Sequence, residues 1–92
     1  MMTGNHTSSA VTLEATTLLA HIGQVVHWLP KREAPRTDLH REIARMEQHL
    51  ATAPLSRGAI LGLQVHVWRL QGSPLRALLN RRVTQLLKLY EG

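Results

Sequence analysis

The stretch LGLQVHVWRL, residues 61–70, decides the fold, because its apolar residues fit two different periods. Alternate residues from Leu61 to Val67 are apolar, which is typical of a half-buried β-strand. Apolar residues also recur at helical spacing, and these are Ile60, Leu63, Val67 and Leu70. No other stretch alternates, and no Asn-Gly or Asp-Gly hairpin signal is present. Because a lone strand would leave its backbone groups unpaired, the sequence predicts a helix.

As a helix, this segment is apolar on two sides. One side carries the four residues at helical spacing, which suffice to join a core. The other side, called the Trp68 stripe below, consists of Leu61, Val65 and Trp68. A helix that is apolar nearly all round is buried on both sides. We therefore expect the Trp68 stripe to meet another helix from a partner or a second copy, or to be covered by residues 11–29 of the same chain.

A second helix is predicted upstream, over residues 11–29, and Pro30 ends it because proline disfavours helical backbone in the preceding residue. Its apolar seam is Val11, Ala15, Leu18, Ile22, Val25 and Leu29, widened by Leu19 and Val26. Residues 1–10, MMTGNHTSSA, are polar and predict a disordered tail. The chain is thus expected to consist of this tail and a single helical domain over residues 11–92.

Turn and cap residues delimit two further helices. Thr37 or Asp38 is a candidate N-cap for a helix with the apolar seam Leu39, Ile43, Met46 and Leu50. Ser56 is a candidate cap for the helix of the opening stretch. Gly72 suits a left-handed C-cap, and Ser73-Pro74 suits the start of a last helix. That helix has the seam Leu75, Leu79, Val83, Leu86 and Tyr90. The prediction is an all-α fold with about four helical segments, as a small bundle or an extended pair of helical hairpins.

Composition limits the function classes. The chain has no cysteine, which excludes disulfides, thiolate metal sites and thiol catalysis and is compatible with the cytoplasm. The N-terminal region has no signal-peptide pattern, and no apolar run approaches the length of a membrane span. We therefore expect a cytoplasmic protein that does not span the membrane.

No motif for catalysis or metal binding is present. The pairs His21/His27 and His40/His49 lack the spacing of metal ligands on one helix face, and no carboxylate completes a set. Asp38 and Glu42 are one turn apart, but neighbouring arginines favour surface ion pairs instead. The six glycines form no phosphate-binding loop. We expect no enzyme, no metal and no cofactor.

The net charge of +5 raises the alternative of a nucleic-acid-binding domain. In that alternative, Arg76, Arg81 and Arg82 contact phosphates. The basic residues are dispersed, however, and aromatic residues for base stacking are few. A steep dependence of binding on salt concentration would distinguish phosphate contacts from apolar helix docking.

The C-terminal part, residues 55–92, resembles the inner-rod proteins and needle co-chaperones of type III secretion systems. The similarity lies in a Pro/Ser turn before an apolar run that ends at Leu63-Gln64, in Leu75 and Leu79 before Arg81-Arg82, and in a Leu86-Leu87-Lys88 terminus. The resemblance implies a small helical protein, cytoplasmic or exported without a signal peptide, that packs on partners and has no catalytic residue.

The favoured prediction is therefore a helical protein–protein interaction module, such as an adaptor, co-chaperone or assembly subunit. It would bury leucine-rich helix faces against a protein partner or in a homo-oligomer. The expected partner-binding residues are Leu61, Val65, Trp68, Leu78 and Leu87.

Overall fold

The protein is an all-α bundle, as predicted. A computed structural model describes the backbone of residues 2–90 and the side chains of residues 10–90. Four helices follow one another along this part of the chain, without a strand: α1 (Met2–His27), α2 (Ala34–Leu50), α3 (Arg57–Trp68) and α4 (Leu75–Leu89). The ambiguous stretch is thus a helix, and the prediction made for it is confirmed.

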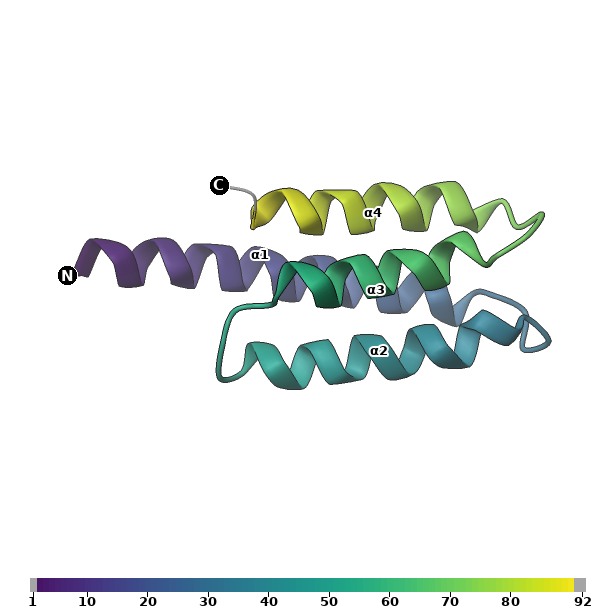
Figure 1. Ribbon diagram of the computed structural model, residues 1–92, viewed down its shortest axis with the longest axis horizontal. Coiled ribbons are helices and arrows are strands. Elements are labelled where there is room, and N and C mark those ends of the chain that lie inside the picture. Colours follow the sequence, from purple (N-terminus) through teal and green to yellow (C-terminus); the bar gives the residue numbers. More distant parts are fainter. Residues whose placement is uncertain (1, 91–92) are drawn as a thin grey trace.

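The four helices form a closed ring, which settles the choice between a bundle and extended hairpins. Each helix packs against two others, in the pairs α1–α2, α2–α3, α3–α4 and α4–α1. Within residues 2–90, α1 and α3 lie diagonally across the ring, as do α2 and α4, and no Cα atoms of a diagonal pair come within 8 Å. The bundle measures 48 × 21 × 19 Å, and the N-terminal part of α1 projects beyond the other helices (Figure 1). Short connections join antiparallel neighbours, as in other up-and-down bundles.

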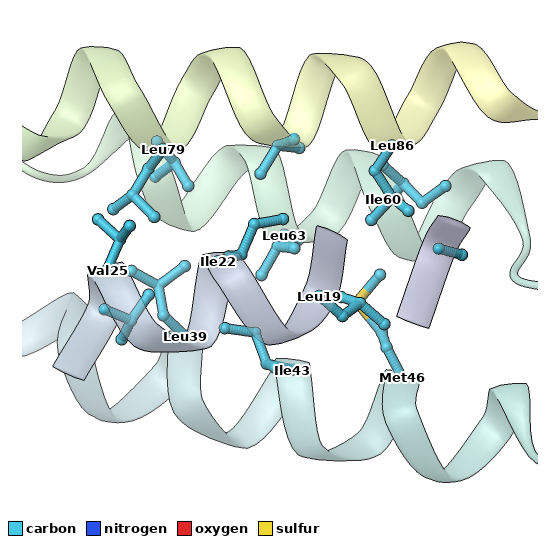
Figure 2. Packing of buried hydrophobic residues seen from close by; sticks show 14 of the residues in the cluster. Leu19, Ile22, Val25, Leu39, Ile43, Met46, Ile60, Leu63, Leu79 and Leu86 are labelled. Carbon is cyan, nitrogen blue, oxygen red and sulfur yellow. The ribbon is translucent and has the colours of Figure 1, made fainter. Parts of the chain in front are cut away.

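The core lies along the axis of this ring, and every helix contributes to it. Figure 2 shows side chains of the cluster from all four helices pointing toward one another. The helical apolar side of α3 is fully buried, with no exposed surface on Ile60, Leu63, Val67 or Leu70. The other fully buried large side chains are Leu19, Ile22, Val26, Leu39, Leu79, Val83 and Leu86. The seams predicted from helical spacing are therefore the core-facing sides.

The seam of α1 departs from the prediction in one respect. Leu19 and Val26, expected only to widen it, are fully buried, whereas Val11 and Leu18 are half-buried. α1 ends at His27, and the next two residues form a tight turn. In this turn the N–H groups of Trp28 and Leu29 donate to the carbonyls of Val25 and Val26.

α1 begins at Met2, before the start predicted at Val11. The predicted disordered tail covers residues 1–10, and the side chains of residues 1–9 lie outside the described part. Disorder of this segment therefore stays a prediction, as does the division of the chain at residue 10.

Some of the predicted helix-cap residues are confirmed, and others are not. The Ser56 hydroxyl accepts a hydrogen bond of 3.1 Å from the Ala59 N–H, so Ser56 caps α3 as predicted. The Ser73 hydroxyl accepts from the Leu75 N–H at 3.2 Å, which supports the start of α4. Gly72 has the predicted left-handed backbone, with φ of 71°. It is not the C-cap, however, because α3 already ends at Trp68 and Arg69 follows as its cap.

The predicted start of α2 was wrong. Neither Thr37 nor Asp38 is the N-cap, because α2 begins at Ala34 and Glu33 precedes it without a side-chain cap bond. Pro35 lies in the first turn, where the missing N–H costs no helical hydrogen bond, and it is buried. Packing of this proline thus starts the helix one turn earlier than a polar cap would. Asp38 forms ion pairs instead.

Candidate protein-binding face on α3

The Trp68 stripe stays exposed after the core is complete. The exposed fractions are 40% for Leu61, 51% for Val65 and 52% for Trp68. The alternative, that residues 11–29 cover the stripe, does not occur, because α1 packs against α2 and α4 rather than α3. Three neighbouring large apolar side chains therefore lie on the outward side of one helix. Contiguous exposed apolar patches of this kind mark interaction surfaces.

Two glycines continue this outward side toward the start of α3. Gly58 and Gly62 are one turn apart, and a Cβ atom built on either would meet no other heavy atom within 4 Å. Both line a groove of about 330 Å³ between α2 and α3, whose apolar lining includes Met46, Leu55 and Ala59. The α3 face, defined here as Gly58, Leu61, Gly62, Val65 and Trp68, thus combines protruding apolar side chains with open space beside them.

The indole of Trp68 is held in place from α4. Its Nε1 donates a hydrogen bond of 3.2 Å to Oδ1 of Asn80, and Nε2 of Gln64 donates to the same oxygen at 3.3 Å. Asn80 therefore holds a half-exposed aromatic ring in one orientation. A ring positioned in advance loses less conformational entropy on binding than a free one. The sequence does not single out Asn80, because its partners Gln64 and Trp68 lie on another helix.

Charged residues of α2 border the α3 face. Arg69 at the end of α3 pairs with Asp38 at 3.0 Å, and Asp38 also lies 3.6 Å from Arg41. One turn farther along α2, Arg45 pairs with Glu42 at 3.1 Å. The predicted role of these carboxylates in surface ion pairs is confirmed. Such exposed pairs contribute little to stability, about 0–1 kcal/mol each, but they give this border both signs of charge.

The other two predicted partner-binding residues lie elsewhere. Leu78 and Leu87 on α4 are half-buried and pack against the core cluster. They therefore expose less apolar surface than the residues of the Trp68 stripe.

The arginines of the nucleic-acid alternative are not brought together. Arg82 lines a groove of about 560 Å³ between α1 and α4. Arg76 lies beside Trp68 in a hollow between α3 and α4. These two residues therefore lie on opposite sides of α4, and Arg81 is exposed. The three do not form the continuous basic surface that follows a phosphate backbone.

The histidines form no metal centre in the described part of the chain. Residues 10–90 contain no group of three side chains that could hold a metal ion. Among residues 10–90, the rings of His27 and His40 lie edge to face with centroids 6.3 Å apart, which joins the end of α1 to α2. This contact pairs one histidine from each of the two pairs considered in the sequence, His21/His27 and His40/His49.

This histidine contact predicts a pH dependence of stability. Burial, and then the positive charges of Arg36 and His27, hold the pKa of His40 below its ordinary value of 6.5. As the pH falls through about 6.5, the His40 imidazole of the unfolded chain therefore binds a proton that the same group in the folded chain does not yet bind. The free energy of unfolding is expected to fall between about pH 7.5 and 5.5, and His40→Gln is expected to flatten this slope. Urea unfolding of the unmodified chain and of His40→Gln at several pH values measures this pH dependence. Equal slopes of unfolding free energy against pH for the two proteins would contradict the prediction.

Comparisons with known proteins identify no relative. No protein-family model, no curated protein and no solved structure matches this chain.

None of the four helices, within the residues described, has the length and apolar character needed to cross a membrane.

Proposed function

We propose that this protein is a non-enzymatic helical interaction module whose α3 face binds another protein. One observation carries the proposal: the ring of four helices closes its core completely while Leu61, Val65 and Trp68 remain outside it. Burying apolar surface gains about 25 cal/mol per Å², so this face has a free-energy gain available only through association. Tryptophan is also among the residues that contribute most to binding.

The surroundings of the α3 face favour docking of a helix. Gly58 and Gly62 of the α3 face line the groove between α2 and α3, and these glycines allow another backbone to approach closely. Charges of both signs on α2 give the face a polar border, as in ordinary protein interfaces. Roles as an adaptor, co-chaperone or assembly subunit all use such a face. The resemblance of residues 55–92 to type III secretion proteins supports the same class of function, inside the cell or after signal-less export.

Site-specific photo-crosslinking in the native host tests this function. A photoreactive amino acid at Val65 is expected to give an adduct of one defined mass. The matched control carries it at Ala20, an exposed position on α1, the helix diagonally across the ring from α3. It is expected to give no such adduct. Failure to crosslink from position 65 under conditions where the chain is expressed and folded would refute the proposal.

A further inference from the structure

We propose that the groove between α1 and α4 is a second docking site, and that its occupant is an acidic amphipathic helix of a partner protein. The groove shares no residue with the α3 face, so this inference does not depend on the proposed function. Three properties of the groove support it: an apolar lining, the length of one docked helix segment, and positive charges that no carboxylate pairs with.

Three leucines line the groove. Leu13 of α1 has 70% of its surface exposed, and Leu18 of α1 and Leu89 of α4 are half-buried. Leu18 and Leu89 also pack against the core cluster, so the apolar lining is continuous with the core. The groove volume of about 560 Å³ lies within the range of ordinary binding sites. This lining would gain free energy by moving from water into contact with an apolar partner.

The groove has the length that a docked helix uses. On α1 its lining residues run from Leu13 to His21, and on α4 from Arg82 to Leu89, toward the end of the bundle from which α1 projects (Figure 1). At a rise of about 1.5 Å per residue, these stretches are about 12 Å and about 10.5 Å long. A helix docks in a groove through apolar residues at positions i, i+3 or i+4, and i+7, which span about 10.5 Å. The groove therefore accommodates one such set of residues.

Charge is distributed unequally over the helices. α2 contains three arginines and three acidic residues, whereas α4 contains four arginine and lysine residues and no acidic residue. The basic residues of α4 are Arg76, Arg81, Arg82 and Lys88. α4 therefore supplies most of the net charge of +5. A surface beside α4 attracts acidic partners and repels basic ones.

Two of these basic residues, Arg82 and Lys88, line the groove on the α4 side. Within residues 10–90 neither forms an ion pair, in contrast to the arginine–carboxylate pairs of α2. The guanidinium of Arg82 donates a hydrogen bond of 3.1 Å to Oε1 of Gln85, a neutral group that leaves the positive charge uncompensated. Glu14, on the α1 side, is the acidic residue in the lining. The carboxylates of a partner are therefore expected along the α4 edge of the docked helix and not along its α1 edge.

The leucines distinguish a protein helix from nucleic acid, which positive charge also attracts. A nucleic-acid backbone makes a continuous row of phosphate contacts, whereas Arg76 and Arg82 lie on opposite sides of α4. An amphipathic helix uses both features of the groove, because its apolar side contacts the leucines and its acidic edge contacts the basic residues. The groove therefore fits such a helix better than it fits nucleic acid.

Fluorescence anisotropy with a synthetic peptide tests the chemistry of the partner. The probe is a labelled, helix-forming peptide of about 16 residues, with leucines at positions i, i+3 and i+7, glutamates along one edge and glutamines along the other. The control peptide has lysines in place of the glutamates. The full chain is expected to bind the acidic peptide with a micromolar dissociation constant and the basic peptide at least about tenfold more weakly.

Substitutions in the groove make the test specific. The double variant Arg82→Gln/Lys88→Gln is expected to weaken binding of the acidic peptide about tenfold and to reduce its dependence on salt. Lys31→Gln/Arg76→Gln, the matched control, removes the same charge from exposed positions away from the groove. It is expected to change the affinity less than about twofold at about 0.15 M salt. Glu14→Gln removes a repulsive carboxylate and is expected to strengthen binding about twofold. Circular dichroism of each variant checks that the helices are intact.

Each of three results would overturn this inference: no saturable binding of the acidic peptide, equal affinities for the acidic and basic peptides, or equal losses of affinity in the two double variants. Duplex DNA that binds more tightly than the acidic peptide, and loses this affinity in Arg82→Gln/Lys88→Gln, would make nucleic acid the occupant instead.

Trp68→Ala separates this groove from the α3 face. The substitution is expected to leave the affinity for the acidic peptide unchanged, because Trp68 does not line the groove. Loss of that affinity would place the peptide on the α3 face, which refutes the docking site between α1 and α4 but not the proposed function. Failure to crosslink from position 65, in turn, refutes the proposed function and leaves this docking site standing.

Discussion

Leu63→Ala is expected to lower the free energy of unfolding by about 3–5 kcal/mol, whereas Leu61→Ala is expected to lower it by about 1 kcal/mol or less. Both leucines belong to α3 and are two residues apart. Leu63 has no exposed surface and packs among core residues of the other helices, as Figure 2 shows. Removing its side chain leaves a cavity, whereas Leu61 is 40% exposed and its truncation opens the site to water.

The difference between Leu63→Ala and Leu61→Ala distinguishes a helix from the β-strand that the alternating apolar residues also fit. In a strand, Leu61 and Leu63 would share one face, and the two substitutions would have similar effects. In the helix they lie on different sides. Urea unfolding followed by helical circular dichroism measures both values. A small domain has about 5–10 kcal/mol of stability, so Leu63→Ala removes a large part of it. Equal losses of unfolding free energy for the two variants would contradict this orientation of α3 in the bundle.

Trp68→Ala is expected to weaken the binding of a protein partner to the α3 face at least about 30-fold. This loss corresponds to the roughly 2 kcal/mol of an interface hot spot. The monomer is expected to keep its stability within about 1 kcal/mol. The ring is half-exposed, and within the monomer the substitution removes one hydrogen bond to Asn80 and part of an apolar contact. Had Trp68 been a core residue, its loss would cost about 3–5 kcal/mol.

Trp28→Ala supplies the matched control. Trp28 is 60% exposed, follows the end of α1, and lies off the α3 face. Its removal is expected to leave both stability and association nearly unchanged. The yield of the photo-adduct from position 65 and thermal unfolding of the two variants measure both properties. If Trp28→Ala disrupts association as strongly as Trp68→Ala, general loss of apolar surface rather than the α3 face is responsible.

Much of the local structure follows from sequence. Helical spacing identified the buried side of every helix, and Ser56 marked the start of α3, because periods and caps depend on residues within a few positions of one another. The error at α2 has a nonlocal cause. Buried Pro35 fixes the first turn through packing, which a search for polar caps at Thr37 or Asp38 overlooks.

Only the tertiary structure decided which face of each helix packs against another helix. From the sequence, the Trp68 stripe could lie beneath α1 or face outward, and both arrangements satisfy the same pattern of apolar residues. The ring places α1 diagonally from α3, so the stripe is left exposed, and Gly58 and Gly62 line a groove between α2 and α3. The same arrangement puts Arg76 and Arg82 on opposite sides of α4 and packs Leu78 and Leu87 against the core. The physical reason is that periodicity fixes the orientation of each helix about its own axis, whereas the order of helices around the core depends on contacts between residues far apart in the chain.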